Sequence, residues 1–143
     1  MRVLGLDVGD KRIGVAVSDP LRIVASPLEV YERRGGARDL DYIAALAETY
    51  GADTVVIGLP LKMEGGDSEQ TKKTREFAAA LAGRTAAKLI FTDERCTTSA
   101  AEEALLEANL PREERKKLID KVAAAILLQD YLNSPPDKRR AEG

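Results

Sequence analysis

The chain has 143 residues, of which 44% are hydrophobic and 32% charged, so it is long enough to form one globular domain with a substantial buried core. Its 22 basic and 24 acidic residues leave a net charge of −2, so a surface that binds an anionic partner must be local. The absence of histidine and the single cysteine, Cys96, exclude Ser-His-Asp and Cys-His catalysis, histidine-containing zinc sites and an intramolecular disulfide. With no signal peptide and no apolar run near about 18 residues, we expect a cytoplasmic protein without membrane contact.

The first part of the chain predicts a β-hairpin followed by a third strand. Residues 3–8 form a short apolar run, and residues 13–18 alternate apolar and small side chains. The residues between them have turn chemistry. Residues 23–31 are typical of a third strand, in which Pro27 favours an edge position or a bulge.

Helices and strands then alternate to the end of the chain. The expected elements are a helix at 40–50, a strand at 54–58, a helix at 68–83, a strand at 88–92, a helix from Thr97 or Thr98 to about 109, and a last helix at about 113–132. Such alternation predicts parallel strands joined by right-handed crossovers. Together with the antiparallel hairpin it predicts an α/β fold with a mixed five-stranded sheet flanked by helices, in one domain over 1–133. We expect residues 61–67 to form an exposed mobile loop and residues 134–143 a flexible charged tail.

Two acidic residues lie where strands end. Asp7 stands within the first apolar strand, where an unpaired carboxylate is costly. Glu94 follows the strand at 88–92, and sites of open α/β sheets form at such carboxyl ends. Each has a simpler interpretation: Asp7 as a cap for the turn at Gly9, and Glu94 as part of an ordinary polar loop.

Asp120 is the most informative acid. On the last helix it shares a face with four apolar side chains, those of Ala123, Ala124, Leu127 and Tyr131. A carboxylate on such a face needs an arginine, a network of hydrogen bonds or a divalent cation. Arg95 or nearby hydroxyl groups are the structural alternative to a metal.

Taken together, Asp7, Glu94 and Asp120 predict a site for Mg²⁺ or Mn²⁺, since carboxylate oxygens suit these ions. A pair of such ions can activate water and stabilise the leaving oxygen in phosphodiester hydrolysis without histidine. The absence of histidine is therefore compatible with a nuclease.

Basic residues and glycines supply weaker candidates. Lys11 with Arg12, and Lys72 with its basic neighbours Lys73 and Arg75, are candidate phosphate contacts, although most charged runs are simply solvated faces. Gly9 and Gly58 occupy expected turns, where the missing side chain would also let a phosphate backbone approach.

Three segments carry a family resemblance. They are LGLDVGDKRIGVAVSD (4–19), VVIGLPLKMEGGDSEQT (55–71) with FTDERCTTSAAE (91–102), and LIDKVAAAILLQDYL (118–132). In this order they resemble the YqgF family, also called RuvX, of RNase H-like fold. The resemblance implies a three-layer RNase H-like fold and a nuclease that depends on Mg²⁺ or Mn²⁺, with maturation of the 5′ end of pre-16S rRNA as its role. It implies that Asp7 bridges two ions while Glu94 and Asp120 each hold one.

The resemblance also covers further positions and shows two departures. Arg95, Thr97 and Thr98 match family positions near the site and imply phosphate contacts. Lys62 stands where the family usually has Asn, and a lysine there would grip phosphate instead. The related RuvC resolvases carry a second acid three residues after the position of Asp120, where this chain has Ala123. One ion would then be held more weakly, and junction cleavage is less supported.

Two other functions stay open. Holliday junction resolution would need a homodimer that presents two sites to a symmetric DNA junction. A non-catalytic nucleic-acid, transcription or ribosome-assembly module would need no buried carboxylate at Asp120. The ATPase fold of actins and sugar kinases shares the opening strand and turn, but it needs two lobes and the chain supplies one. The resemblance implies an RNA precursor as the partner, ahead of a DNA junction.

Overall fold

The structure is a computed structural model, and it describes residues 1–62, 65–93 and 111–134. In chain order its elements are β1 (Arg2–Val8), β2 (Arg12–Ser18), β3 (Ala25–Glu32), α1 (Ala37–Thr49), β4 (Ala52–Leu59), α2 (Glu69–Ala82), β5 (Lys88–Asp93) and α4 (Arg112–Asn133). The helix expected from Thr97 or Thr98 to about 109, and residues 135–143 of the expected tail, lie outside these ranges.

The five strands form one mixed sheet in the order β3-β2-β1-β4-β5. β1 pairs antiparallel with β2, and β2 antiparallel with β3, as the hairpin pattern predicts. β1 pairs in parallel with β4, and β4 with β5, as the helix–strand alternation predicts. The predicted mixed five-stranded sheet is confirmed.

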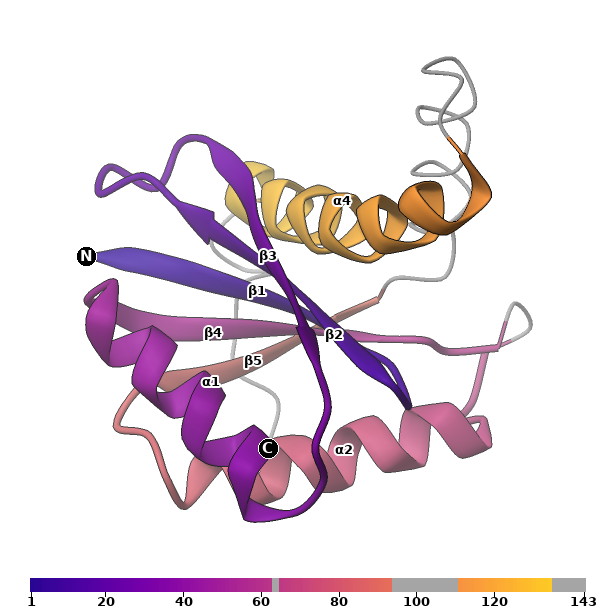
Figure 1. Cartoon of the computed structure of the whole chain (residues 1–143). Coiled ribbons are helices and arrows are strands. Elements are labelled where there is room, and N and C mark those ends of the chain that lie inside the picture. Colours follow the sequence, from indigo (N-terminus) through magenta and orange to yellow (C-terminus); the bar gives the residue numbers. More distant parts are fainter. Residues whose placement is uncertain (63–64, 94–110, 135–143) are drawn as a thin grey trace.

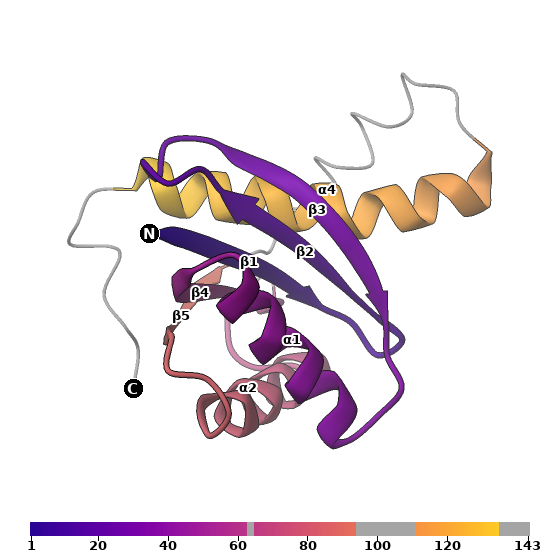
Figure 2. The same cartoon turned by 60° about the vertical axis from the view of Figure 1, so that its left-hand side comes forward.

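The sheet is the middle layer of three. Helix α4 lies along one face of it, while α1 and α2 cover the other (Figures 1 and 2). The cores on the two faces are mainly aliphatic. The α1/α2 side packs around residues such as Leu4, Leu6 and Ile57, and the α4 side around Val3, Val56 and Leu128. Alternate residues of each strand therefore belong to different faces.

β3 is an edge strand, and its register shifts opposite Val15 and Ala16, which pair with Glu29 and Pro27. The proline thus lies both at an edge and beside a bulge, the two environments that tolerate its missing N–H. The strand begins at Ala25, later than expected, because the Asp19 carboxylate accepts hydrogen bonds from the N–H groups of Ile23 and Val24 and holds them in a turn.

Helix starts differ modestly from expectation. α1 begins at Ala37, three residues before the first apolar position of its pattern, and buried Asp39 in its first turn accepts hydrogen bonds from the N–H groups of Arg34 and Gly35. α2 begins after Ser68, which forms a capping box with Thr71. In the described part of the chain, no helix is long and apolar enough to cross a membrane.

Candidate functional site

The parallel strands β1, β4 and β5 end at the same edge of the sheet, and Asp7 of β1 lies at that edge. Leu6, Ile57 and Phe91 lie in one row of paired residues, and Gly58 pairs with Thr92 in the next. Asp7 follows Leu6 on β1, so it lies in the row of Gly58 and Thr92.

Asp7 belongs to the face that α4 covers. Leu6 and Val8 contribute to the α1/α2 core, while Val3, on the alternate face, contributes to the α4 core. Gly5 also faces α4, since a Cβ built there would lie 3.1 Å from the carbonyl oxygen of Ala124. Asp7 is the next residue on this face, and it is only partly buried.

Glycines flank Asp7 in the sheet. Gly14 of β2 is its Cα partner on one side, and Gly58 of β4 lies in the same row on the other. Neither neighbour has a side chain to cover the carboxylate on this face. A cation or a phosphate group therefore meets less steric obstruction beside Asp7 than it would beside larger residues.

Asp120 lies on the sheet-facing side of α4, as its pattern predicts. Ala123, Ala124, Leu127 and Tyr131, which share its face, are all buried. The side chain of Asp120 itself remains 30% exposed, and its Oδ2 lies 3.3 Å from Nε of Arg12. Burial raises the pKa of Asp120, and the nearby Arg12 guanidinium opposes that rise without cancelling it. Among the described residues, the cation beside Asp120 is Arg12, and Arg95, considered from the sequence, lies outside them.

Asp7 and Asp120 lie toward the same end of the interface between β1 and α4. The two elements run in opposite directions (Figure 1). Val3 packs in the cluster that includes Leu127 and Tyr131, and Gly5 lies against Ala124 and Leu128. Asp120 precedes Ala124 by one helical turn, just as Asp7 follows Gly5 on the strand. The fold therefore brings together two acids that are 113 positions apart in the sequence.

The third acid, Glu94, lies outside the described residues, directly after Asp93 at the end of β5. Among the residues that the structure describes, no group of three or more histidine, cysteine or acidic side chains is placed to hold a metal ion. The donor set of the described part fits one side of such a site: two carboxylates on facing layers, of which Asp120 already has a cationic neighbour.

The predicted phosphate contacts have different fates. Lys11 and Lys62 are exposed, and Lys62 closes a turn with Gly66. Lys72 makes a loose ion pair with Glu69 at 3.8 Å, with both side chains largely exposed. Arg12 lies in a partly exposed ion pair with Asp120. Arg95, Thr97 and Thr98 lie outside the described residues.

Gly9 is explained by the hairpin turn itself. Its N–H donates to the carbonyl of Arg12 at 2.8 Å, and a Cβ there would lie 2.9 Å from that oxygen. Its carbonyl accepts a hydrogen bond from Arg33. Both backbone groups are thus engaged within the protein, which favours the turn interpretation of this glycine.

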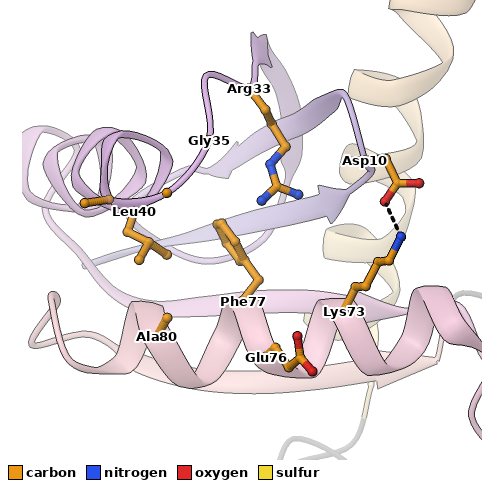
Figure 3. Close-up of a pocket in the computed structure, with 10 residues that line it drawn as sticks. Asp10, Arg33, Gly35, Leu40, Lys73, Glu76, Phe77 and Ala80 are labelled. Atoms are coloured by element: carbon orange, nitrogen blue, oxygen red, sulfur yellow. Dashed lines mark hydrogen bonds and ion pairs between the residues drawn. The ribbon is translucent and has the colours of Figure 1, made fainter.

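A pocket of about 640 Å³ lies on the opposite face of the sheet, between α1, α2 and the β1–β2 turn. Figure 3 shows Lys73 reaching toward Asp10, and Arg33 above the ring of Phe77. Arg33 also binds the buried Asp39, which accepts hydrogen bonds from Tyr31 as well. No periodic pattern or motif in the sequence indicates this network, because its members come from a strand, a loop and a helix start.

Comparisons with known proteins decide the family. A family model described as "RuvX: Holliday junction resolvase" matches residues 1–134. A protein of Clostridium botulinum, named "Putative pre-16S rRNA nuclease", is 45% identical over 94% of this chain and 98% of its own length. The chain belongs to the RuvX family. A protein of the same name from Clostridium novyi is 46% identical, over 94% of this chain and 99% of its own length.

Solved structures confirm the RNase H-like fold of this RuvX family member. RuvC of T. thermophilus in complex with a Holliday junction substrate aligns with a TM-score of 0.58 and 16% identity, over 92% of this chain and 94% of that one. The fowlpox virus Holliday junction resolvase aligns with a TM-score of 0.57 and 16% identity, over 94% of this chain and 100% of that one. At these identities the likeness concerns the fold alone.

Proposed function

We propose that this chain is a divalent-metal-dependent nuclease that hydrolyses phosphodiester bonds in RNA, and that it acts in maturation of the 5′ end of pre-16S rRNA. The observation that carries the proposal is the convergence of Asp7 and Asp120 at one end of the β1–α4 interface. It occurs in a chain 45% identical, over almost its whole length, to a protein named for that activity.

Asp7, Asp120 and Glu94 would hold the metal, with Asp7 as the shared ligand. When bound, two Mg²⁺ or Mn²⁺ ions supply an activated water and offset charge on the leaving oxygen. The position of Asp7 in the sheet, in the row between Gly14 and Gly58, supports its role as the ligand shared by both ions. The proposal of Glu94 as the third metal ligand rests on the sequence alone. Glu94 directly follows β5, whose end lies beside that of β4.

The protein's cations would bind and orient the substrate strand. Two exposed lysines lie next to strands of the candidate site. Lys11 lies in the connection between β1 and β2, and Lys62 follows the end of β4. Their ammonium groups suit contacts with the phosphate backbone, which position a nucleic acid without reading its sequence. Arg12, Lys72, Arg95, Thr97 and Thr98 are the other proposed phosphate contacts. Gly58, which the structure places within β4 and not in the expected turn, would let a phosphate backbone approach because it has no side chain.

The substrate is tested with a cleavage panel in Mn²⁺ and in Mg²⁺. The panel contains a pre-16S rRNA fragment that includes the 5′ junction, an unrelated single-stranded RNA, a single-stranded DNA and a four-way DNA junction. We expect cleavage of the rRNA precursor at the mature 5′ end and little cutting of the DNA junction. Paired symmetric nicks in the junction by a dimer would favour the resolvase function, and binding without cleavage of every substrate would favour a non-catalytic module.

A further inference from the structure

We propose that Arg12 occupies the metal position beside Asp120 and is displaced from it when a divalent ion binds. The released guanidinium then becomes available to the phosphate backbone of the substrate. This inference rests on the proposed metal site, and it adds to that site a coupling between metal loading and nucleic-acid binding.

The first support is the position of Arg12. It opens β2, directly after the hairpin turn, and it shares a strand face with Gly14 and Ala16. Ala16 packs in the α4 core, so Arg12 approaches Asp120 from the sheet side, at the edge where Asp7 lies. The guanidinium therefore lies in the region where a metal ligated by Asp7 and Asp120 would have to bind.

The second support is the looseness of the ion pair. One atom pair, Nε to Oδ2, joins Arg12 to Asp120 at 3.3 Å, and the two side chains are 31% and 30% exposed. Arg75 and Asp67, by contrast, share two hydrogen bonds, the bidentate geometry that makes Arg–carboxylate pairs strong. A partly exposed pair such as that of Arg12 with Asp120 stabilises weakly and exchanges readily with solvent.

Arg33 provides the contrast within the same sheet. Its Nε donates to Asp39, a fully buried carboxylate, at 2.9 Å, and its Nη1 donates to the carbonyl of Gly9 at 2.9 Å. Its guanidinium also lies 5.2 Å from the centre of the Phe77 ring. Arg33 is thus fixed by three partners, whereas within the described ranges Asp120 is the one acid in ion-pair distance of Arg12.

The third support is charge. A divalent ion on Asp120 would place two positive charges beside a guanidinium, and repulsion at such short distance favours departure of the arginine. The partly exposed side chain can turn toward solvent at the same edge, next to the exposed Lys11. Metal binding would thereby convert an internal ion pair into a phosphate contact.

The test is Mn²⁺ binding to the full chain without nucleic acid, measured by calorimetry for the wild type, Arg12→Gln and Arg84→Gln. Arg84→Gln removes one arginine from an ion pair with Asp41, away from the candidate site, and it serves as the matched control. We expect Arg12→Gln to bind Mn²⁺ at least about threefold more tightly, because the competing cation is gone, and Arg84→Gln to match the wild type. Weaker or unchanged Mn²⁺ binding by Arg12→Gln would overturn the proposal.

A second measurement tests whether the displaced Arg12 contributes to RNA binding. Affinity for a single-stranded RNA is measured with and without Ca²⁺, used as a divalent ion that binds carboxylates. The wild type should gain more RNA affinity from the metal than Arg12→Gln does, because only the wild type releases an arginine. An equal gain in RNA affinity on adding Ca²⁺ in both proteins would overturn the proposed contribution of the displaced Arg12.

Folding and the proposed function are controlled separately. If Arg12→Gln does not fold, the Nε–H resonance of Arg12 in the wild type, assigned with Arg12→Lys, reports the exchange: it should shift on Mg²⁺ titration, and no shift at saturating Mg²⁺ would contradict the proposal. Should the wild type bind no divalent ion at all, the proposed nuclease function fails together with this inference. If the wild type binds Mn²⁺ and cleaves RNA but Arg12→Gln has an unchanged affinity for Mn²⁺, only this inference is overturned and the proposed nuclease function stands.

Discussion

Gly5 of β1 lies so close to Leu128 of α4 that a Cβ built on the glycine would stand 2.8 Å from the Leu128 Cβ. Real Cβ atoms do not approach that closely, so any larger residue at position 5 must displace the helix or the strand. The contact therefore sets the distance between the two elements that carry Asp7 and Asp120.

Gly5→Ala is expected to lower the free energy of unfolding by about 1–3 kcal/mol, the usual cost of overpacking a core. It should also reduce metal-dependent cleavage by more than the loss of folded protein explains, because α4 moves relative to Asp7. Urea unfolding and cleavage rates check both effects. The matched control is Gly83→Ala, where the new Cβ would lie 3.5 Å from the nearest atom and φ is −78°. Equal behaviour of the two variants would argue against a close-packed β1–α4 contact.

Asp120→Asn should raise the melting temperature modestly, by about 1–3 °C, at pH 7 in a metal-free buffer. Burial raises the pKa of Asp120, so its ionised form is disfavoured in the folded protein and the charge costs stability at neutral pH. Since the folded pKa lies above the unfolded one, this cost vanishes as pH falls below the unfolded value of about 4. Melting curves in EDTA between pH 3.5 and 7 measure the difference, and a lower melting temperature at pH 7 would mean that the Arg12 pair stabilises the fold.

Asp39→Asn is expected to destabilise the protein by about 3 kcal/mol, because it leaves the Arg33 network without its buried counter-charge. Burial alone would raise the pKa of Asp39, but the hydrogen bonds from Arg33, the Arg34 N–H and Tyr31 outweigh it and lower the pKa. The stabilisation is therefore present above the unfolded pKa of about 4 and is lost as pH falls through the folded pKa.

Chemical denaturation at pH 7 and pH 3.5 checks this prediction. The difference in the free energy of unfolding between the wild type and Asp39→Asn should be smaller at pH 3.5 than at pH 7. Asp41→Asn is the control, since Asp41 makes an ion pair with Arg84 in which its side chain is 65% exposed. If both variants cost the same, the buried network is not what stabilises the start of α1.

Mn²⁺ should raise the melting temperature of the wild type, because an ion that binds only the folded protein stabilises it by mass action. The rise should be lost in Asp7→Asn and in Asp120→Asn and kept in Asp10→Asn. Asp10 lies three residues from Asp7 but pairs with Lys73 on the other side of the hairpin turn. Thermal shift assays against Mn²⁺ concentration provide the measurement. A full Mn²⁺ response in Asp7→Asn would place the ion elsewhere.

Much of the fold could be predicted from the sequence, because its signals are local. Alternating residues, Pro27 at an edge with a bulge, and the apolar stripe that follows Asp120 each obey one structural period, and the structure confirms them. The resemblance to the RuvX family is confirmed as well. The grouping of Asp7, Glu94 and Asp120 in one metal site stays a prediction, since Glu94 lies outside the described residues.

The contacts that the sequence did not predict join residues without a shared period. Within the described residues the ion-pair partner of Asp120 is Arg12, 108 positions earlier, and nothing in the spacing of the two residues distinguishes Arg12 from other arginines. Asp39 has the appearance of an ordinary acid in a first helical turn, yet it is fully buried and accepts hydrogen bonds from Tyr31 and Arg33. Such pairings depend on how the layers pack, which only the assembled fold fixes.

Cleavage of single-stranded RNA by Asp7→Asn in Mn²⁺, beside the wild type and Asp10→Asn, tests the central claim most directly. We predict that Asp7→Asn remains folded by circular dichroism and loses cleavage to the level seen in EDTA, while Asp10→Asn cleaves at the rate of the wild type. Undiminished Mn²⁺-dependent cleavage by folded, pure Asp7→Asn would contradict the account.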